Sequence, residues 1–420
     1  MIQFSAETHC NRYLTAGATT VDAIVSITAS GAPDGARATG FPAAAEVILL
    51  DVSGSMGGKT RKLQAAKAAT ATAIDCLRDG VQFGIVAGHQ YATRVYPLGD
   101  DLAEANDDTR EAAKRAVARL DAGGGTAIGQ WLLEAERWLP EDEHVIRHAI
   151  LLTDGYNQHE KPKQLLAALD RCEGRFQCDC RGVGTDWAVD ELRTIGSRLL
   201  GTVDIIREPA DMEADFRSMM EQSMGKATGV ATLRIWTPAG ARVELVSQVL
   251  PEIADISSRR EETSDRIGDY PTGAWANESR DYHIRISFPA RAVGDEMLAA
   301  RVSLVVGDEV TTQAMVEVTW TDDLNLSTAI VGRLAHYVEQ EEGVVAIRAG
   351  LTALASGDTE TATERLTVAR EIAIRTGNIE QVSQIERLID PVTARLHDRL
   401  DRADMMELDT RSVKTVRIGS

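Results

Sequence analysis

The stretch Val47-Ile48-Leu49-Leu50-Asp51-Val52-Ser53-Gly54-Ser55 decides how this chain is expected to fold. Its apolar beginning lacks polar alternation, which is typical of a strand covered on both faces of a parallel sheet. A carboxylate and two hydroxyls follow this strand. Because ligands of open α/β sheets bind beyond the carboxyl ends of the strands, these side chains are candidates for a binding site.

Two later stretches bring further oxygen-bearing side chains to similar places. Thr126 follows three consecutive glycines, and Asp154 follows the apolar run Ala149-Ile150-Leu151-Leu152-Thr153. Hard oxygen ligands without His or Cys suit Mg²⁺, Mn²⁺ or Ca²⁺ and argue against zinc or copper. The candidate metal ligands are Asp51, Ser53, Ser55, Thr126 and Asp154.

Runs typical of strands and of helices alternate between residues 44 and 226. With strands this apolar, the alternation predicts an α/β domain whose doubly wound, mostly parallel sheet is covered by helices on both faces. The runs with the composition of strands predict a six-stranded sheet. These runs are 46–50, 81–87, 89–98, 145–153, 176–183 and 203–206.

The period of the hydrophobic pattern changes to two after Gly229. Tyr282, Ile284 and Ile286, for example, alternate with polar residues, and the pattern predicts an added antiparallel β-sandwich over residues 227–322. Residues 1–42 share this period, and a segment of about 40 residues cannot bury a core alone. We therefore expect residues 1–42 to supply strands to the sandwich, with the α/β domain inserted between its two parts.

A helical region is predicted over residues 323–404. Gly357-Asp358 and Gly377-Asn378 each combine a helix-ending glycine with a residue that caps the next helix. These signals predict a packed helical hairpin.

The last residues, 405–420, are predicted to form a flexible tail. Thr410 and Thr415 lie in this segment, each with an aliphatic residue three positions further on. The spacing is similar to what forkhead-associated domains accept around phosphothreonine. A phosphorylated tail that binds such a signalling protein is therefore an alternative to a plain disordered end.

Composition excludes several classes of partner. The 420 residues carry a formal net charge of -19, whereas nucleic acids and anionic membranes are bound by basic surfaces. The first residues lack the basic and apolar parts of a signal peptide, and no run approaches the roughly 20 apolar residues of a membrane helix. We expect a cytoplasmic protein that binds neither nucleic acid nor membrane.

The D-x-S-x-S stretch, the threonine in a glycine turn and the T-D-G stretch resemble, in this order, a von Willebrand factor type A domain of the bacterial intracellular type. The resemblance implies a Rossmann-like fold over about residues 44–225 and a metal-ion-dependent adhesion site. It implies that Asp51, Ser53 and Ser55 hold the cation, that Thr126 binds directly or through water, and that Asp154 contacts it through water. It also implies a protein partner whose acidic side chain completes the site, with AAA+ ATPases among the partners of such proteins.

Other interpretations of the first stretch have less support. Asp51 and the serines alone could only cap the next helix. A phosphate-binding loop that ends in Gly58-Lys59-Thr60 needs a glycine where the chain has Ser53.

We do not expect an enzyme, although a metal-assisted hydrolase that uses the same cation is the alternative function. A serine and histidine pair could be drawn, but the G-x-S-x-G pattern is absent from the sequence. A third alternative is an inert site that only stabilises the fold.

Overall fold

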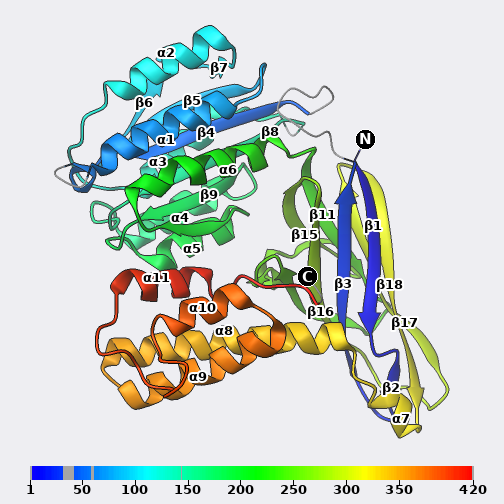
Figure 1. The fold of residues 1–420 in the computed structure, drawn as a ribbon. Coiled ribbons are helices and arrows are strands. Elements are labelled where there is room, and N and C mark those ends of the chain that lie inside the picture. Colours follow the sequence, from blue (N-terminus) through cyan, green and yellow to red (C-terminus); the bar gives the residue numbers. More distant parts are fainter. Residues whose placement is uncertain (1, 32–41, 58–60, 143, 419–420) are drawn as a thin grey trace. The chain divides into compact units, whose positions relative to one another are not determined.

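The computed structural model describes residues 2–31, 42–57, 61–142 and 144–418. The chain divides into two compact units (Figure 1). The α/β unit comprises residues 32–229. The second unit, here called the sandwich unit, comprises residues 2–31 together with residues 230–420. The α/β unit is thus inserted in sequence between two parts of the sandwich unit.

The α/β unit is built on a mixed sheet. Over its described residues this sheet has seven strands in the order β10-β9-β8-β4-β5-β6, with β7 paired to β5. The central strands run parallel, and the edge strands β6 and β7 run antiparallel to β5. The strands are β4 (Ala44–Asp51), β5 (Gln82–Gly88), β6 (Ala92–Tyr96), β7 (Ala103–Glu104), β8 (Ile146–Thr153), β9 (Gln177–Val183) and β10 (Val203–Ile206).

The prediction of a doubly wound, mostly parallel sheet is confirmed, but the number of strands predicted from the sequence is one too low. The missed strand, β7, is two residues long, and no periodic pattern can mark so short a strand. All residues of β4 are buried, as its apolar composition predicts.

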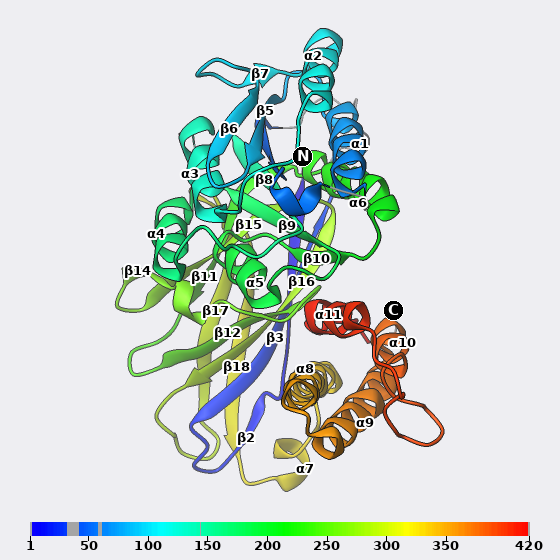
Figure 2. The same cartoon turned by 90° about the vertical axis from the view of Figure 1, so that its left-hand side faces the viewer.

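Helices cover both faces of this sheet (Figure 2). Helices α1 and α6 pack against each other on one face, and α3 and α4 pack together on the other. The helices are α1 (Lys62–Cys76), α2 (Asp107–Ala118), α3 (Ile128–Trp138), α4 (Pro162–Cys172), α5 (Val189–Arg198) and α6 (Met212–Met224).

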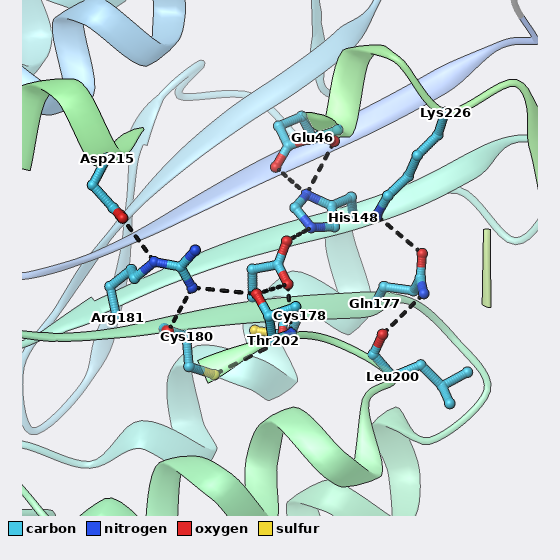
Figure 3. A network of polar contacts seen from close by, with 12 residues as sticks. Glu46, His148, Gln177, Cys178, Cys180, Arg181, Leu200, Thr202, Asp215 and Lys226 are labelled. Carbon is cyan, nitrogen blue, oxygen red and sulfur yellow. Dashed lines mark hydrogen bonds and ion pairs between the residues drawn. The ribbon is translucent and has the colours of Figure 1, made fainter. Parts of the chain in front are cut away.

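A buried ionic cluster ties three neighbouring strands of this sheet to α6 (Figure 3). The ring of His148 on β8 lies between two carboxylates: Nδ1 is 2.8 Å from Glu46 Oε1 on β4, and Nε2 is 2.9 Å from Asp179 Oδ2 on β9. Ser223 on α6 donates a hydrogen bond of 2.8 Å to Glu46 Oε2. Burial lowers the pKa of His148, but Glu46 and Asp179 outweigh burial and raise it above its ordinary value, while Lys226 opposes them.

We predict that the cluster makes stability depend on pH in a defined direction. Because the folded pKa of His148 is raised, its contribution is complete below the unfolded value of about 6.5 and is lost as pH rises through the folded value. His148→Gln should lower the free energy of unfolding by about 3 kcal/mol at neutral pH, the order of cost of breaking a buried ion pair. Chemical denaturation of both proteins across pH measures the difference.

The difference in unfolding free energy between wild type and His148→Gln should become smaller as pH rises. A difference that stays constant across pH contradicts the prediction. His144→Gln is the matched control, because His144 is an exposed histidine of the same unit.

The sandwich unit contains two sheets over its described residues, with the strand orders β1-β3-β16-β12-β13 and β14-β15-β11-β17-β18-β2. Residues 2–31 supply β1 and β3 to the first sheet and β2 to the second. The alternating residues Tyr282, Ile284 and Ile286 lie in its core without solvent exposure. The strands are β1 (Gln3–Cys10), β2 (Tyr13–Thr15), β3 (Thr20–Ser30), β11 (Thr228–Trp236), β12 (Arg242–Leu250), β13 (Ala254–Asp255), β14 (Glu261–Ser264), β15 (Ile267–Trp275), β16 (Glu278–Ser287), β17 (Glu296–Val306) and β18 (Glu309–Thr321).

The helical part of this unit has the expected helix boundaries. Gly357 and Gly377 end α8 and α9 with φ of 82° and 75°, the left-handed conformation that glycine adopts without strain. Asp358 and Asn378 cap the helices that follow. The helices are α7 (Leu324–Ser327), α8 (Gly332–Ser356), α9 (Thr359–Thr376), α10 (Ile379–Glu386) and α11 (Arg402–Arg411). None of the helices, as far as the structure describes them, has the length and apolar character needed to cross a membrane.

The prediction of a flexible tail after residue 405 is wrong for residues 405–418. Leu408 on α11 is buried in a cluster with Ile347 and Leu366. Beyond α11 the backbone pairs with the segment after β12: Ile253 N donates to Val413 O at 2.8 Å, and Thr415 N donates to Pro251 O at 2.9 Å. The order comes from backbone hydrogen bonds to a distant segment, which local composition does not reveal.

The two threonines considered for phosphorylation are held in this ordered segment. Thr410 is 3% exposed and donates to Met406 O at 2.7 Å, and Thr415 Oγ1 donates to Val249 O at 2.6 Å. A kinase could therefore reach them only after the segment detaches.

A buried carboxylate, Asp281, binds the side chain of Arg417 in the C-terminal segment. Asp281 on β16 has no solvent exposure, and its two oxygens accept hydrogen bonds from Arg417 Nη2 at 2.5 Å and from the hydroxyl of Tyr337 at 2.6 Å.

We predict that Arg417→Ala destabilises the sandwich unit by about 2–4 kcal/mol, because it leaves a buried negative charge without its cationic partner. Thermal and chemical denaturation measure the loss. The double variant Arg417→Ala/Asp281→Asn should recover part of it, and a double variant less stable than Arg417→Ala contradicts this explanation.

Candidate metal centre

The residues predicted as metal ligands meet at the carboxyl ends of two neighbouring parallel strands. Asp51 ends β4, and Asp154 follows the adjacent strand β8. Ser53 and Ser55 lie in the loop after β4, where Gly54–Met56 form a short 3₁₀ helix, η1. Thr126 lies in the loop just before α3. Parallel strands end on the same edge of a sheet, which is why residues so distant in sequence come together.

Hydrogen bonds link these side chains to one another. Ser53 Oγ lies 2.9 Å from Ser55 Oγ, and Ser55 Oγ donates to Asp154 Oδ1 at 2.5 Å. Asp51 is held from two sides, because Oδ1 accepts from Ser53 N at 2.7 Å and Oδ2 accepts from Thr153 Oγ1 at 2.6 Å. Both carboxylates are therefore fixed in orientation.

The hydroxyl of Thr126 joins the same group. A Cβ atom built on Gly155 would lie 3.2 Å from Ser55 Oγ and 3.5 Å from Thr126 Oγ1. The two hydroxyls thus flank a space that a side chain at position 155 would fill, and glycine leaves this space open. Carboxylate and hydroxyl oxygens around such a space fit a hard divalent cation.

Two carboxylates are buried here, which is unfavourable unless positive charge is nearby. Asp51 and Asp154 both have no solvent exposure. Burial raises the pKa of Asp51 to about 6, although hydrogen bonds from Ser53 and Thr153 lower it, and the charge of Asp154 raises it further. A cation bound here would favour the ionised form of Asp51.

Lys62 is part of this site and was missed by the sequence reasoning. Its ammonium donates to Asp154 Oδ2 at 2.7 Å from the first residue of α1. Its position at the start of α1 is the sequence signal that could have identified it. A basic residue in the first turn of a helix is unfavourable because its charge opposes the helix dipole.

The glycine turn positions Thr126. Gly123 N donates to Val52 O at 2.8 Å, and Gly54 N donates to Gly124 O at 3.0 Å, so the turn is bonded to the loop after β4. Gly125 N donates to the side chain of Gln90 at 2.8 Å. These bonds fix the position of the turn and therefore of the Thr126 hydroxyl.

A cavity of about 190 Å³ opens above the site. Ser55 is exposed in it, whereas Ser53 and Thr126 are buried at 2% and 4% exposure. The exposed side chains of Tyr156, His159 and Asp186 lie among its lining residues. A small acidic side chain from outside could therefore reach the oxygen cluster.

We predict that the left-handed conformation of Gly124 is required in this turn. Gly124 has φ of +80°, and a Cβ there would collide with the Gln90 side chain that holds the turn. Gly124→Ala should destabilise the α/β unit by about 1–2 kcal/mol, the cost of the left-handed conformation for other residues. Gly123→Ala is the matched control, because nothing lies within 4 Å of its added Cβ. Equal unfolding free energies of the two variants contradict the prediction.

The chain is similar to known proteins both over part of the α/β unit and over its whole length. A family model for the von Willebrand factor type A domain matches residues 47–157. The structure of a von Willebrand factor type A protein from Catenulispora acidiphila is similar to the chain at 44% identity, covering 99% of this chain and 97% of that chain with a TM-score of 0.94.

A second solved structure, the ArnB paralog VWA2 from Sulfolobus acidocaldarius, covers 99% of both chains at 14% identity with a TM-score of 0.62, which shows a shared fold alone. The search of curated proteins found no match. Since the Catenulispora protein matches over both units at an identity well above 30%, the chain belongs to the von Willebrand factor type A family.

Proposed function

We propose that this protein is an adaptor or scaffold that binds a partner protein through a divalent cation. Mg²⁺, or Mn²⁺ or Ca²⁺ in its place, would be held by Asp51, Ser53, Ser55, Thr126 and Asp154. The observation that carries the proposal is the cluster of buried carboxylates and hydroxyls beneath an open cavity of about 190 Å³.

The ligand set explains why such a site would bind an acidic side chain. Hydroxyls fill coordination positions without adding negative charge, so the cation keeps its attraction for an anionic ligand from outside. Asp51 and Asp154 are oriented by hydrogen bonds and cannot easily rearrange to add further bonds to the cation. A carboxylate of the partner is then the ligand that best completes the coordination.

The exposed rim would add specificity to this interaction. Tyr156, which is 40% exposed, and His159 lie beside the cavity and can contact the residues that flank the acidic side chain. We place the partner in the cytoplasm, with AAA+ ATPases and phosphothreonine-binding signalling proteins as candidate classes. The second class requires the C-terminal segment to detach first.

Metal binding and partner binding should fail together when the site is changed. In isothermal titration calorimetry, Asp51→Asn should weaken Mn²⁺ binding more than about 100-fold, since loss of even an outer partner of a metal ligand costs roughly 10–100-fold. Asp100→Asn is the matched control, because this aspartate side chain is fully exposed. Affinity capture with wild type should then retain a partner with Mg²⁺ and release it with EDTA, and Asp51→Asn should retain none.

Three results would contradict the proposed function. In the first, Mn²⁺ binds equally to wild type and Asp51→Asn. In the second, the purified protein hydrolyses phosphoesters with Mn²⁺ in an Asp51-dependent manner, which would identify a hydrolase. If EDTA lowers only the melting temperature and leaves partner binding unchanged, the cation is structural.

A further inference from the structure

Lys62 places a positive charge inside the candidate metal centre. Its side chain is 14% exposed, and its ammonium contacts Asp154, which has no exposed side-chain surface. The same ammonium lies beside the loop after β9, where a Cβ on Gly184 would be 3.7 Å from Nζ. The charge is therefore enclosed between α1 and the loops that surround the oxygen cluster.

Local sequence rules are broken at this position. The first turn of α1 begins with Lys62 and contains no acidic residue, although the positive end of a helix dipole favours acidic side chains. The preceding residue, Arg61, has φ of 55°, a left-handed conformation that costs residues other than glycine about 1–3 kcal/mol. Such violations are expected where function, and not local stability, selects the residue.

The buried charges explain what Lys62 does. Asp51 and Asp154 carry two negative charges, and Lys62 cancels one of them. A divalent cation would therefore leave the buried part of the site with a net positive charge, whereas without Lys62 the same cation would make it neutral. One external carboxylate restores neutrality only when Lys62 is present.

We propose that Lys62 makes cation binding depend on the acidic ligand. Its ammonium weakens binding of the cation alone and strengthens binding of a carboxylate to the loaded site. By linkage the cation and the carboxylate then raise each other's affinity by the same factor. This inference rests on the proposed function, and Lys62 acts in it as a specificity-determining residue that contacts Asp154.

The test uses Mn²⁺ and acetate as probes of the full-length protein. Calorimetry measures the Kd of Mn²⁺ in acetate and in chloride of the same ionic strength, for wild type and Lys62→Met. We expect Lys62→Met to bind Mn²⁺ alone at least about tenfold more tightly, because an enclosed like charge has been removed. Acetate should lower the Kd of wild type by a larger factor than that of Lys62→Met.

Two matched variants separate charge from other effects. Lys62→Arg keeps the charge and should behave as wild type. Lys67→Met removes an equal charge from the same helix, where Lys67 bonds to Ala118 O at 3.0 Å outside the site, and should also behave as wild type. Melting temperatures in EDTA show that each variant folds, and MnCl₂ should raise the melting temperature of Lys62→Met more than that of wild type.

Asp51→Asn distinguishes the failure of this inference from failure of the proposed function. If Mn²⁺ binding requires Asp51 but has the same Kd and the same acetate effect in wild type and Lys62→Met, only the role of Lys62 is overturned. Weaker binding by Lys62→Met overturns it as well. If neither wild type nor Lys62→Met binds Mn²⁺, or if binding does not require Asp51, both proposals fall.

Discussion

The burial of two carboxylates at one edge of a parallel sheet is the constraint on which the candidate site depends. Asp51 and Asp154 end up side by side because β4 and β8 are adjacent and run in the same direction. Charges this close and this buried repel each other and lose their hydration, so the surroundings must supply compensation. The hydroxyls of Ser55 and Thr153, the amide of Ser53 and the ammonium of Lys62 all act in this way.

Buried carboxylates also need compensating positive charge in two places away from the candidate site, and there the chain itself supplies it. The carboxylates of Glu46 and Asp179 face two positive charges, the ring of His148 and the nearby ammonium of Lys226, and Asp281 in the sandwich unit is paired with Arg417. In these places the compensation is complete within the chain. At the candidate metal centre Lys62 matches only one of two carboxylates, which leaves one negative charge for a cation to match. This difference separates a site that can bind a ligand from clusters that hold the fold together.

Much of the fold and all of the candidate ligands could be predicted from the sequence. The apolar strand before Asp51, the glycines before Thr126 and the glycines at the ends of α8 and α9 are local signals with local physical causes. The ligation of a cation by the five residues stays a prediction. The exposed tail was predicted wrongly because the backbone of Val413 and Thr415 is ordered by a distant segment. Strand β7 was missed because a strand of two residues is too short to show a hydrophobic period.

By itself the sequence determined which residue types stand at the ends of which elements, since hydrophobic period, glycine conformation and helix capping act over a few neighbouring residues. It therefore determined the candidate oxygen ligands and the change from an α/β unit to a sandwich. Only the tertiary structure decided which charges meet. The contacts of Lys62 with Asp154, of His148 with Glu46 and of Arg417 with Asp281 join residues from 92 to 136 positions apart. Charge pairing acts across space, and no local pattern encodes the distance between such groups.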